Sequence, residues 1–581
     1  MAPLLPDNSA AEDRIRTRAL AWTIVLTPAL LLLWYVIVYA VNGAEWDHLS
    51  SAEIFYRWDQ HNFTFEYLFR QHNEHRKAVA RLMTLGLGLL TRWNNRPEAV
   101  MHWALVCATA VILFAAFRRD IRERDSVTRA LLWFAPAAWL LTSPRSYEAL
   151  LGDGFPHYCS IVGFAGALYF LIYARSSPGL AAAIFCGLVS SFSISNGLLI
   201  WPLGAVIIAS EWRTGTDRRR VLTQVGIWAL AGALTLAFYF HGYIDPGNHS
   251  GPDFVFHHPL KALAHFLATN GSCLAPHRYA AALVGGILLA LDAWCLLMVL
   301  DDWWRRRVRP PLGAWLIVTV VISIMMITLN RAGFGVRQAM ESRYTGISVL
   351  APVGIYWCVV ARRDSWHVAR RMTTALTVFL LAGYLYAAVD AWAIAPKWYS
   401  RKSWMAYLNY SAKYQPTSLL LQLYPNADHG RIYSREMERM HYNVFAEEHV
   451  LPAQLIPGGP RPDYRVLEVN LHRPYGETPI EVGESGEVVV TGWALNERRT
   501  GPARALFLTV DGTRDFPGHP GIYSESLGGF FVGRGRRWAA FTASFGGFVL
   551  EPGEHTLAVK IVADDGRRAF VSSPIARIIR R

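Results

Sequence analysis

Long apolar runs alternate with short charged loops over the first two thirds of the chain. The first run covers 19–41 and follows Arg14, Arg16 and Arg18. It is longer than the core of a signal peptide, so we expect a retained membrane span. Further runs follow at 99–117, 130–142, 158–174, 180–193, 197–210, 221–240, 278–300, 312–330, 346–361 and 372–393. The pattern predicts an α-helical polytopic membrane domain with about eleven spans.

The loops between these runs alternate between two kinds. Those at 118–129, 175–179, 211–220, 301–310 and 361–371 are short and mostly rich in arginine, whereas the others are longer and aromatic or acidic. The positive-inside rule places the arginine-rich loops and the N-terminus in the cytoplasm, and an odd number of spans then places the C-terminus outside. Arginine also greatly outnumbers lysine, as is common in GC-rich bacterial genomes. We therefore expect a multi-pass protein of the bacterial inner membrane with a periplasmic C-terminal domain.

The pattern changes after the last apolar run. Residues 1–393 form the expected membrane domain, and 394–462 are expected to form a periplasmic helical linker. From 463 to 581 short alternating segments such as GEVVVTGWAL and HTLAVKIVAD are separated by Gly, Pro and Asp. Strands at such spacing are typical of an all-β sandwich of the jelly-roll type. The fold class we predict is a polytopic helical membrane protein with a C-terminal β-sandwich domain.

Composition agrees with a membrane protein. Of the 581 residues 52% are hydrophobic and only 17% are charged, and the formal net charge is +13. Because the basic residues are concentrated in the short loops on one side, the charge sets topology, and we expect no nucleic-acid partner. The six cysteines include no CxxC pair, which argues against a zinc module and a disulfide scaffold.

The first outer loop, 42–98, is too long to be only a connector and contains most of the candidate chemistry. Asp47 is our first choice for a general base that deprotonates a hydroxyl, with Glu45 as its neighbour or substitute. Glu74 could position an acceptor or an ion. The alternative for Asp47 is that it caps the helix that follows, and the alternative for Glu74 and its neighbours is a solvated helical face.

Two groups of cations are candidate ligands for a phosphate. The first is His75, Arg76 and Lys77 in the same loop; the second is Arg337 and Arg343, which lie with Arg331 and Glu341 at the outer end of a span. Interface snorkelling is the alternative for the second group. Candidate ligands for the sugar or the acceptor are Trp46, His48, Asp153 and His157, and the outer loops also contain Arg145 and Glu148.

An acidic motif directly after the first span, inside a large first outer loop, resembles the GT-C class of membrane glycosyltransferases. That class includes oligosaccharyltransferases, protein mannosyltransferases, aminoarabinose lipid A transferases and mycobacterial arabinofuranosyltransferases. The resemblance covers 19–393 in layout, but only Glu45-Trp46-Asp47 and the stretch from Gln71 to Arg76 in residue detail. The motif here is Glu-x-Asp, not two adjacent acids. The C-terminal domain is similar to the carbohydrate-binding-like modules of some arabinofuranosyltransferases.

The resemblance implies an active site at the outer membrane face and a polyprenyl-phosphate sugar donor in the lipid bilayer. The acceptor is then a glycan, a lipid or a protein, and the sugar a hexose or a pentose. No cofactor is required by the sequence; a divalent cation, Mg or Mn, could bind between Asp47 and Glu74. Two alternatives stay open: a transporter or flippase of lipid-linked sugars, and a non-catalytic envelope scaffold whose β domain binds glycans.

Overall fold

The computed structural model describes residues 8–121, 126–215, 217–247, 251–363, 369–476, 478–530 and 534–581. These residues form two compact units. Unit 1 comprises Met1–Val38, Phe63–Thr84 and Glu98–Ala393, and unit 2 comprises Tyr39–Asn62, Leu85–Pro97 and Ile394–Arg581. The first outer loop of the sequence is therefore divided between the two units.

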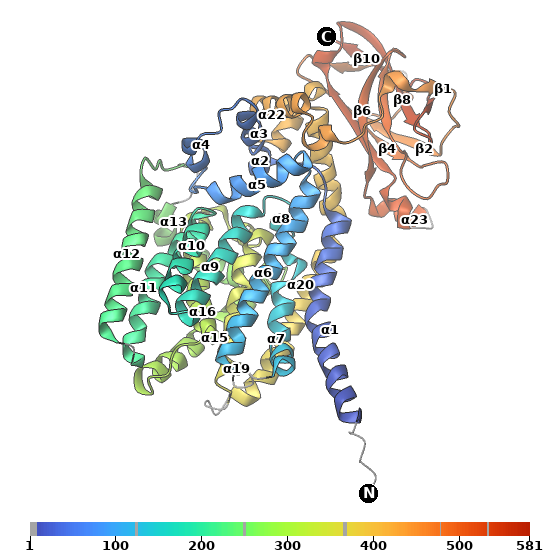
Figure 1. Cartoon of the computed structure of the whole chain (residues 1–581). Helices are drawn as coiled ribbons and strands as arrows, with labels where there is room; N and C mark the ends of the chain where they lie inside the picture. Colours follow the sequence, from blue (N-terminus) through green and yellow to red (C-terminus); the bar gives the residue numbers. More distant parts are fainter. Residues whose placement is uncertain are drawn as a thin grey trace. The chain divides into compact units, whose positions relative to one another are not determined.

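Among the described residues, eight helical segments are long and apolar enough to cross a membrane. They are Ile15–Tyr39, Asn95–Asp120, Phe155–Tyr173, Arg218–Phe240, Arg278–Arg305, Leu312–Phe334, Ser342–Ala361 and Arg370–Tyr410. They contain the helices α1 (Asn8–Tyr39), α6 (Asn95–Asp120), α9 (Phe155–Tyr173), α12 (Arg218–Phe240), α15 (Arg278–Arg305), α16 (Leu312–Arg331), α19 (Leu350–Ala361) and α20 (Ala369–Tyr410) (Figure 1). The chain is a polytopic α-helical membrane protein, as the sequence predicts.

The count differs from the eleven spans expected, because the three short runs form short helices. α7 (Val127–Leu141) and α10 (Ser177–Ser191) have 15 residues each, and α11 (Ile200–Ser210) has 11. At about 1.5 Å of rise per residue none of them reaches the roughly 30 Å of a bilayer core. Between α10 and α11, residues 192–194 are not helical and interrupt the helical path, and the 3-10 helix η2 (Ser195–Leu199) follows them.

Further short helices connect these segments. In unit 1 they are α4 (Phe65–Phe69), α8 (Tyr147–Leu150), α13 (Gly251–His257), α14 (Pro259–Gly271), α17 (Val336–Ala339) and α18 (Thr345–Ser348), and in unit 2 α2 (Trp46–Leu49), α3 (Ala52–Asp59), α21 (Thr417–Leu423), α22 (Ala427–Met440) and α23 (Glu525–Phe530). α5 (Ala78–Thr91) begins in unit 1 and ends in unit 2.

Small residues let the helices of unit 1 pack with their backbones in contact. A Cβ atom placed on Gly271 of α14 would lie 2.0 Å from the carbonyl oxygen of Ala281 in α15, and one placed on Gly285 would lie 1.8 Å from that of Leu267. Such close approach is typical of helix pairs in membranes. Substitution of either glycine would force α14 and α15 apart.

The C-terminal part of unit 2 is a curled β domain in which most, but not all, strand pairs are antiparallel. Its strands are β1 (Ile456–Pro457), β2 (Tyr464–Val469), β3 (Ile480–Val482), β4 (Glu487–Ala494), β5 (Leu506–Val510), β6 (Arg514–Ile522), β7 (Ala540–Gly546), β8 (Gly553–Val562), β9 (Arg568–Val571) and β10 (Ala576–Arg580). They pair in the order β1-β9-β8-β5-β6-β7-β4-β2, and β10 pairs with both β3 and β8. Strand β4 alternates between buried and half-buried residues, and its valines pack with Phe541 and Phe545. The predicted β domain is confirmed.

Candidate functional site

In unit 2, Glu45 is a buried carboxylate held by two cations. Its oxygens lie 3.1 Å from Arg401 Nη2 and 3.3 Å from Lys402 Nζ. The side chains of Glu45 and Lys402 are only 9% and 3% exposed, whereas that of Arg401 is 47% exposed. Removal of one partner from a buried ion pair strongly destabilises the fold, because it leaves the other charge buried without a partner. Glu45 therefore has a defined structural role.

Asp47 lies two residues further, in the first turn of α2, and it is exposed. The N-cap positions of α2 and α3 are Glu45 and Ser51, so Asp47 does not cap the helix that follows it. Burial raises the pKa of the nearby Tyr424 hydroxyl, and the carboxylates of Asp47 and Glu53 raise it further. This fixes Asp47 and Tyr424 as electrostatic neighbours within unit 2.

The two other residues of this motif differ from each other. Trp46 is 48% exposed and has a φ of 51°, a backbone conformation that bulky residues rarely adopt. Strain of this kind is concentrated at functional positions. His48, by contrast, is 5% exposed and packs edge-to-face on Trp93 with ring centroids 5.8 Å apart. Trp46 is thus available to a ligand, whereas His48 is part of the packing.

In unit 1, Arg76 anchors the segment 71–77 to the C-terminal end of α12. Its guanidinium donates to the carbonyl oxygens of Tyr239 at 2.6 Å, His241 at 2.5 Å and Phe69 at 2.7 Å. The Tyr239 hydroxyl accepts from the Arg76 backbone N–H and donates to the carbonyl of Glu74. The last carbonyls of a helix lack partners within it, and Arg76 supplies donors for them. Arg76, expected to bind phosphate, therefore has a structural role.

His75 is half-buried between η2 and Glu74, with 17% of its side chain exposed. Its Nδ1 accepts the backbone N–H of Ser195 at 3.3 Å, and its Nε2 lies 3.6 Å from Glu74 Oε1. Burial lowers the pKa of His75 to about 3. The imidazole is therefore neutral near pH 7, and the bond from Ser195 places its proton on Nε2, facing Glu74. A neutral His75 can donate a hydrogen bond but supplies no positive charge.

Three ion pairs lie at the same end of the membrane helices. Lys77 Nζ lies 3.2 Å from Asp153 Oδ2, and Arg331 Nη2 lies 3.0 Å from Glu74 Oε1. The guanidinium of Arg343 pairs with Glu341, and its backbone N–H donates to Glu148 Oε2 at 3.1 Å. The set is positioned by the N-terminal ends of α5 and α9 and by the segment from Arg331 to Arg343 after α16.

His157, in the first turn of α9, joins this set. Lys77, Asp153 and Arg343 are all close enough to act on it electrostatically, and His157 in turn acts on His75. We call Glu74, His75, Lys77, Asp153, His157, Arg331 and Arg343 the charged cluster. The structure thus brings together most of the candidate residues of unit 1. Arg337 lies apart from these pairs, exposed on α17.

The sequence did not predict some of the contacts at the end of the membrane helices where the charged cluster lies. Arg145, only 4% exposed, has Nη1 3.4 Å from Asp390 Oδ2 and donates from Nη2 to the Met340 carbonyl at 3.3 Å. Asp390 interrupts the apolar run 372–393, and a charge inside such a run is a signal that could have identified it. Nothing in the sequence marks Tyr239 or the backbone of Ser195 as partners of the 71–77 segment.

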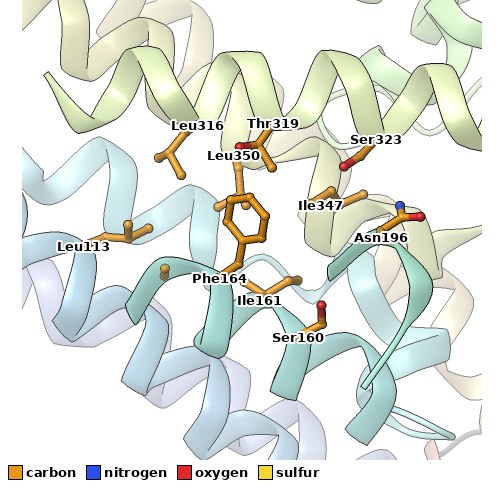
Figure 2. A pocket seen from close by; sticks show the side chains of 11 residues that line it. Leu113, Ser160, Ile161, Phe164, Asn196, Leu316, Thr319, Ser323, Ile347 and Leu350 are labelled. Atoms are coloured by element: carbon orange, nitrogen blue, oxygen red, sulfur yellow. The ribbon is translucent and has the colours of Figure 1, made fainter. Parts of the chain in front are cut away.

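A small cavity of about 30 Å³ lies among the helices of unit 1 (Figure 2). Apolar side chains from α6, α9, α16 and α19 line most of it, and Figure 2 shows Ser160, Asn196 and Ser323 gathered at one side. Asn196 directly follows Ser195, which contacts His75. The lining is Leu113, Ser160, Ile161, Phe164, Ala165, Asn196, Leu316, Thr319, Ser323, Ile347 and Leu350, with no charged residue. The lining is apolar, but the cavity is far smaller than the roughly 300–1,000 Å³ of a ligand pocket.

Within the part of the chain that the structure describes, no group of three or more His, Cys, Asp and Glu side chains is arranged to hold a metal ion. Asp47 and Glu74, the pair considered for a divalent cation, belong to different units. The metal requirement stays a prediction.

Comparison with solved structures finds a similarity to the archaeal oligosaccharyltransferase AglB from Archaeoglobus fulgidus, in complex with an inhibitory peptide and a dolichol-phosphate. The TM-score is 0.39 and the sequence identity 14%. The match covers 70% of this chain and 60% of that chain, so this chain spans less than two thirds of AglB. No protein-family model and no curated protein matches the sequence.

Proposed function

We propose that this protein is a membrane glycosyltransferase of the GT-C type that moves a sugar from a polyprenyl-phosphate donor to a hydroxyl of a glycan, lipid or protein. The observation that carries the proposal is the charged cluster, because several cations and carboxylates gather at one end of the apolar helices. Such a gathering offers the charged hydrogen-bond donors that bind a phosphate and the acceptors that bind sugar hydroxyls. In this proposal the cluster lies at the periplasmic face of a bacterial inner membrane.

The phosphate of the donor binds to the cations of the cluster. Lys77 and Arg343 are the principal ligands, and exposed Arg337 attracts the lipid headgroup. Arginine can bind a phosphate through two parallel hydrogen bonds, whereas lysine acts as a point charge. Neutral His75 and His157 contribute hydrogen bonds, and Asp153 and Glu74 orient the two cations they pair with.

Asp47 is the general base. It takes the proton from the acceptor hydroxyl while the acceptor oxygen bonds to the anomeric carbon of the sugar. The bond from that carbon to the phosphate oxygen breaks, and polyprenyl phosphate leaves with the electron pair. Attack opposite the leaving group inverts the anomeric carbon. Glu45 is unsuited to this step because Arg401 and Lys402 hold it in a buried site, while exposed Trp46 can stack on a sugar ring.

The apolar helices of unit 1 support a lipid-linked donor, because the polyprenyl chain of such a donor lies in the bilayer that these helices are long and apolar enough to cross. A divalent cation, Mg or Mn, would assist phosphate departure by neutralising charge. The donor sugar in this proposal is a hexose or a pentose.

The experiment is a transfer assay with the purified full chain in liposomes. The probes are synthetic short-chain polyprenyl phosphates carrying a labelled hexose or pentose, and membranes of the source cells supply the acceptor. We expect label in acceptor material together with released polyprenyl phosphate. Movement of intact donor across the bilayer, with the sugar–phosphate bond unbroken, would instead identify a flippase.

A further inference from the structure

A second surface of unit 1 lies at the other ends of the membrane helices. α11 ends at Ser210, the 3-10 helix η3 (Glu211–Thr214) follows, α12 begins at Arg218, and α15 ends at Arg305. Trp303 Nε1 donates to the Ser210 carbonyl at 3.3 Å, which joins the ends of α15 and α11. We call Trp212, Arg213, Arg218, Trp303, Trp304 and Arg305 the aromatic–arginine surface.

Indole rings hold two of the three arginines of this surface, Arg213 and Arg218. The guanidinium carbon of Arg213 lies 3.9 Å from the ring centroid of Trp304 and 5.6 Å from that of Trp303. Its Nη2 also donates to the Trp304 carbonyl at 2.7 Å. Arg218 lies 4.9 Å from the centroid of Trp212. A cation–π contact fixes the position of a guanidinium but leaves its positive charge in place.

The charged cluster at the opposite ends shows a different arrangement. There Lys77, Arg331 and Arg343 each pair with a carboxylate. At the aromatic–arginine surface Trp212 and Trp304 are 58% and 57% exposed, and the Arg305 side chain is 78% exposed. Arg305 lies 2.7 Å from Asp301, but a pair this exposed adds little and leaves the guanidinium accessible.

Helix length places this surface at the edge of a bilayer. The 28 residues of α15 extend about 42 Å, more than the roughly 30 Å of a hydrocarbon core, so its last turn reaches the headgroups. Tryptophan is enriched at that level. Exposed Arg219 and Arg220 add further positive charge nearby, whereas exposed Arg306 pairs with Asp302 at 3.3 Å.

We propose that the aromatic–arginine surface is a binding site for anionic phospholipid headgroups. The tryptophans enter the interface between headgroups and chains, and the arginines they hold bind the lipid phosphate and its net negative charge. A zwitterionic phospholipid has the same phosphate but no net charge, so it binds more weakly. The proposal is independent of the glycosyl transfer, because the two surfaces lie at opposite ends of the helices.

The test is a titration of the purified full chain in neutral detergent with dihexanoylphosphatidylglycerol or dihexanoylphosphatidylcholine, followed by the apparent Tm. We expect only the phosphatidylglycerol to raise the Tm, with an effect that decreases as NaCl is added. Inorganic phosphate at the same concentration should leave the Tm unchanged. The variant R218Q/R305Q should bind phosphatidylglycerol about tenfold or more weakly, since each arginine near a lipid surface contributes about 1 kcal/mol.

The matched control is R278Q. Arg278 lies on an exposed aromatic ring, that of Tyr279, 4.6 Å from its centroid, but at the other end of α15. R278Q should keep wild-type affinity. Equal Tm shifts with the two lipids would overturn the proposal, as would equal losses in R278Q and R218Q/R305Q. If R218Q/R305Q does not fold, the wild type alone tests the proposal. An affinity of the wild type for dihexanoylphosphatidylglycerol that does not change with NaCl would overturn the proposal.

Discussion

Ser195 donates its backbone N–H to Nδ1 of His75 at 3.3 Å, across 120 residues of sequence. The bond joins η2, at the break between α10 and α11, to the segment 71–77. It fixes the proton of the neutral imidazole on Nε2, and it keeps His75 from turning toward solvent.

The first prediction is an acid-dependent loss of stability caused by His75. Burial lowers its pKa to about 3 in the folded chain, whereas an unfolded histidine has a pKa of about 6.5. The unfolded state therefore takes up the proton first, so the stabilisation is complete above pH 6.5 and is lost as the pH falls toward 3. Between pH 7 and pH 5 the free energy of unfolding should fall by about 2 kcal/mol, measured by denaturation at each pH.

The variant His75→Gln tests the assignment, because glutamine keeps polar atoms but does not titrate. It should flatten the stability profile between pH 7 and pH 5. The control is His441→Gln on an exposed histidine of unit 2, which should keep the wild-type profile. An unchanged slope in His75→Gln would show that His75 is not held neutral in the folded chain.

The second prediction separates Arg76 from phosphate binding. Its guanidinium donates to three carbonyls at the end of α12 and beside it, a geometry that lysine cannot reproduce. Arg76→Lys should lower the free energy of unfolding by about 2–4 kcal/mol, because two or more carbonyls lose their donors. At a temperature where the variant is folded, binding of polyprenyl phosphate should be within twofold of wild type. Lost binding with unchanged stability would reverse this assignment.

The third prediction distinguishes the two acids of the Glu-Trp-Asp motif. Glu45→Gln leaves Lys402, which is only 3% exposed, without its carboxylate, and should cost about 3–5 kcal/mol. Asp47→Asn changes an exposed side chain and should cost less than about 0.5 kcal/mol. Thermal unfolding of the two variants side by side measures the difference. Adding Lys402→Met to Glu45→Gln should restore part of the stability; a result with no recovery would speak against the pair.

The sequence predicted the fold class well, because membrane helices and alternating strands have strong hydrophobic periods. It overcounted the long spans because the runs at 130–142, 180–193 and 197–210 are apolar but short. It also missed β6, which pairs with β5 and β7 although it contains Pro517 and Pro520. Proline cannot donate to a strand ladder, so its presence argued against a central strand. The pairing of β6 with β7 shifts register at Pro520, which shows how the sheet accommodates it.

The sequence predicted which residues gather in the candidate site better than it predicted the role of each residue. Glu74 and Lys77 stood out because they lie in the long first outer loop, Asp153 because it lies in another outer loop, and Arg343 because it adjoins an apolar run. The structure places the four in one cluster. The roles of Arg76 and His48 could not be predicted, because they depend on partners far apart in sequence, such as the carbonyl of Tyr239 and the ring of Trp93. Spacing alone could not separate Glu45 from Asp47, whereas burial does.

The most direct test of the proposed function is the rate of sugar transfer by Asp47→Asn. With a labelled polyprenyl-phosphate sugar as donor, removal of the base should reduce transfer by about a hundredfold or more while donor binding and Tm stay at wild-type values. The matched control is Asp59→Asn, an exposed acid of α3 that pairs with Arg439 at 2.7 Å in the same unit, and it should transfer at the wild-type rate. Wild-type transfer by Asp47→Asn would contradict the assignment of Asp47 as the base.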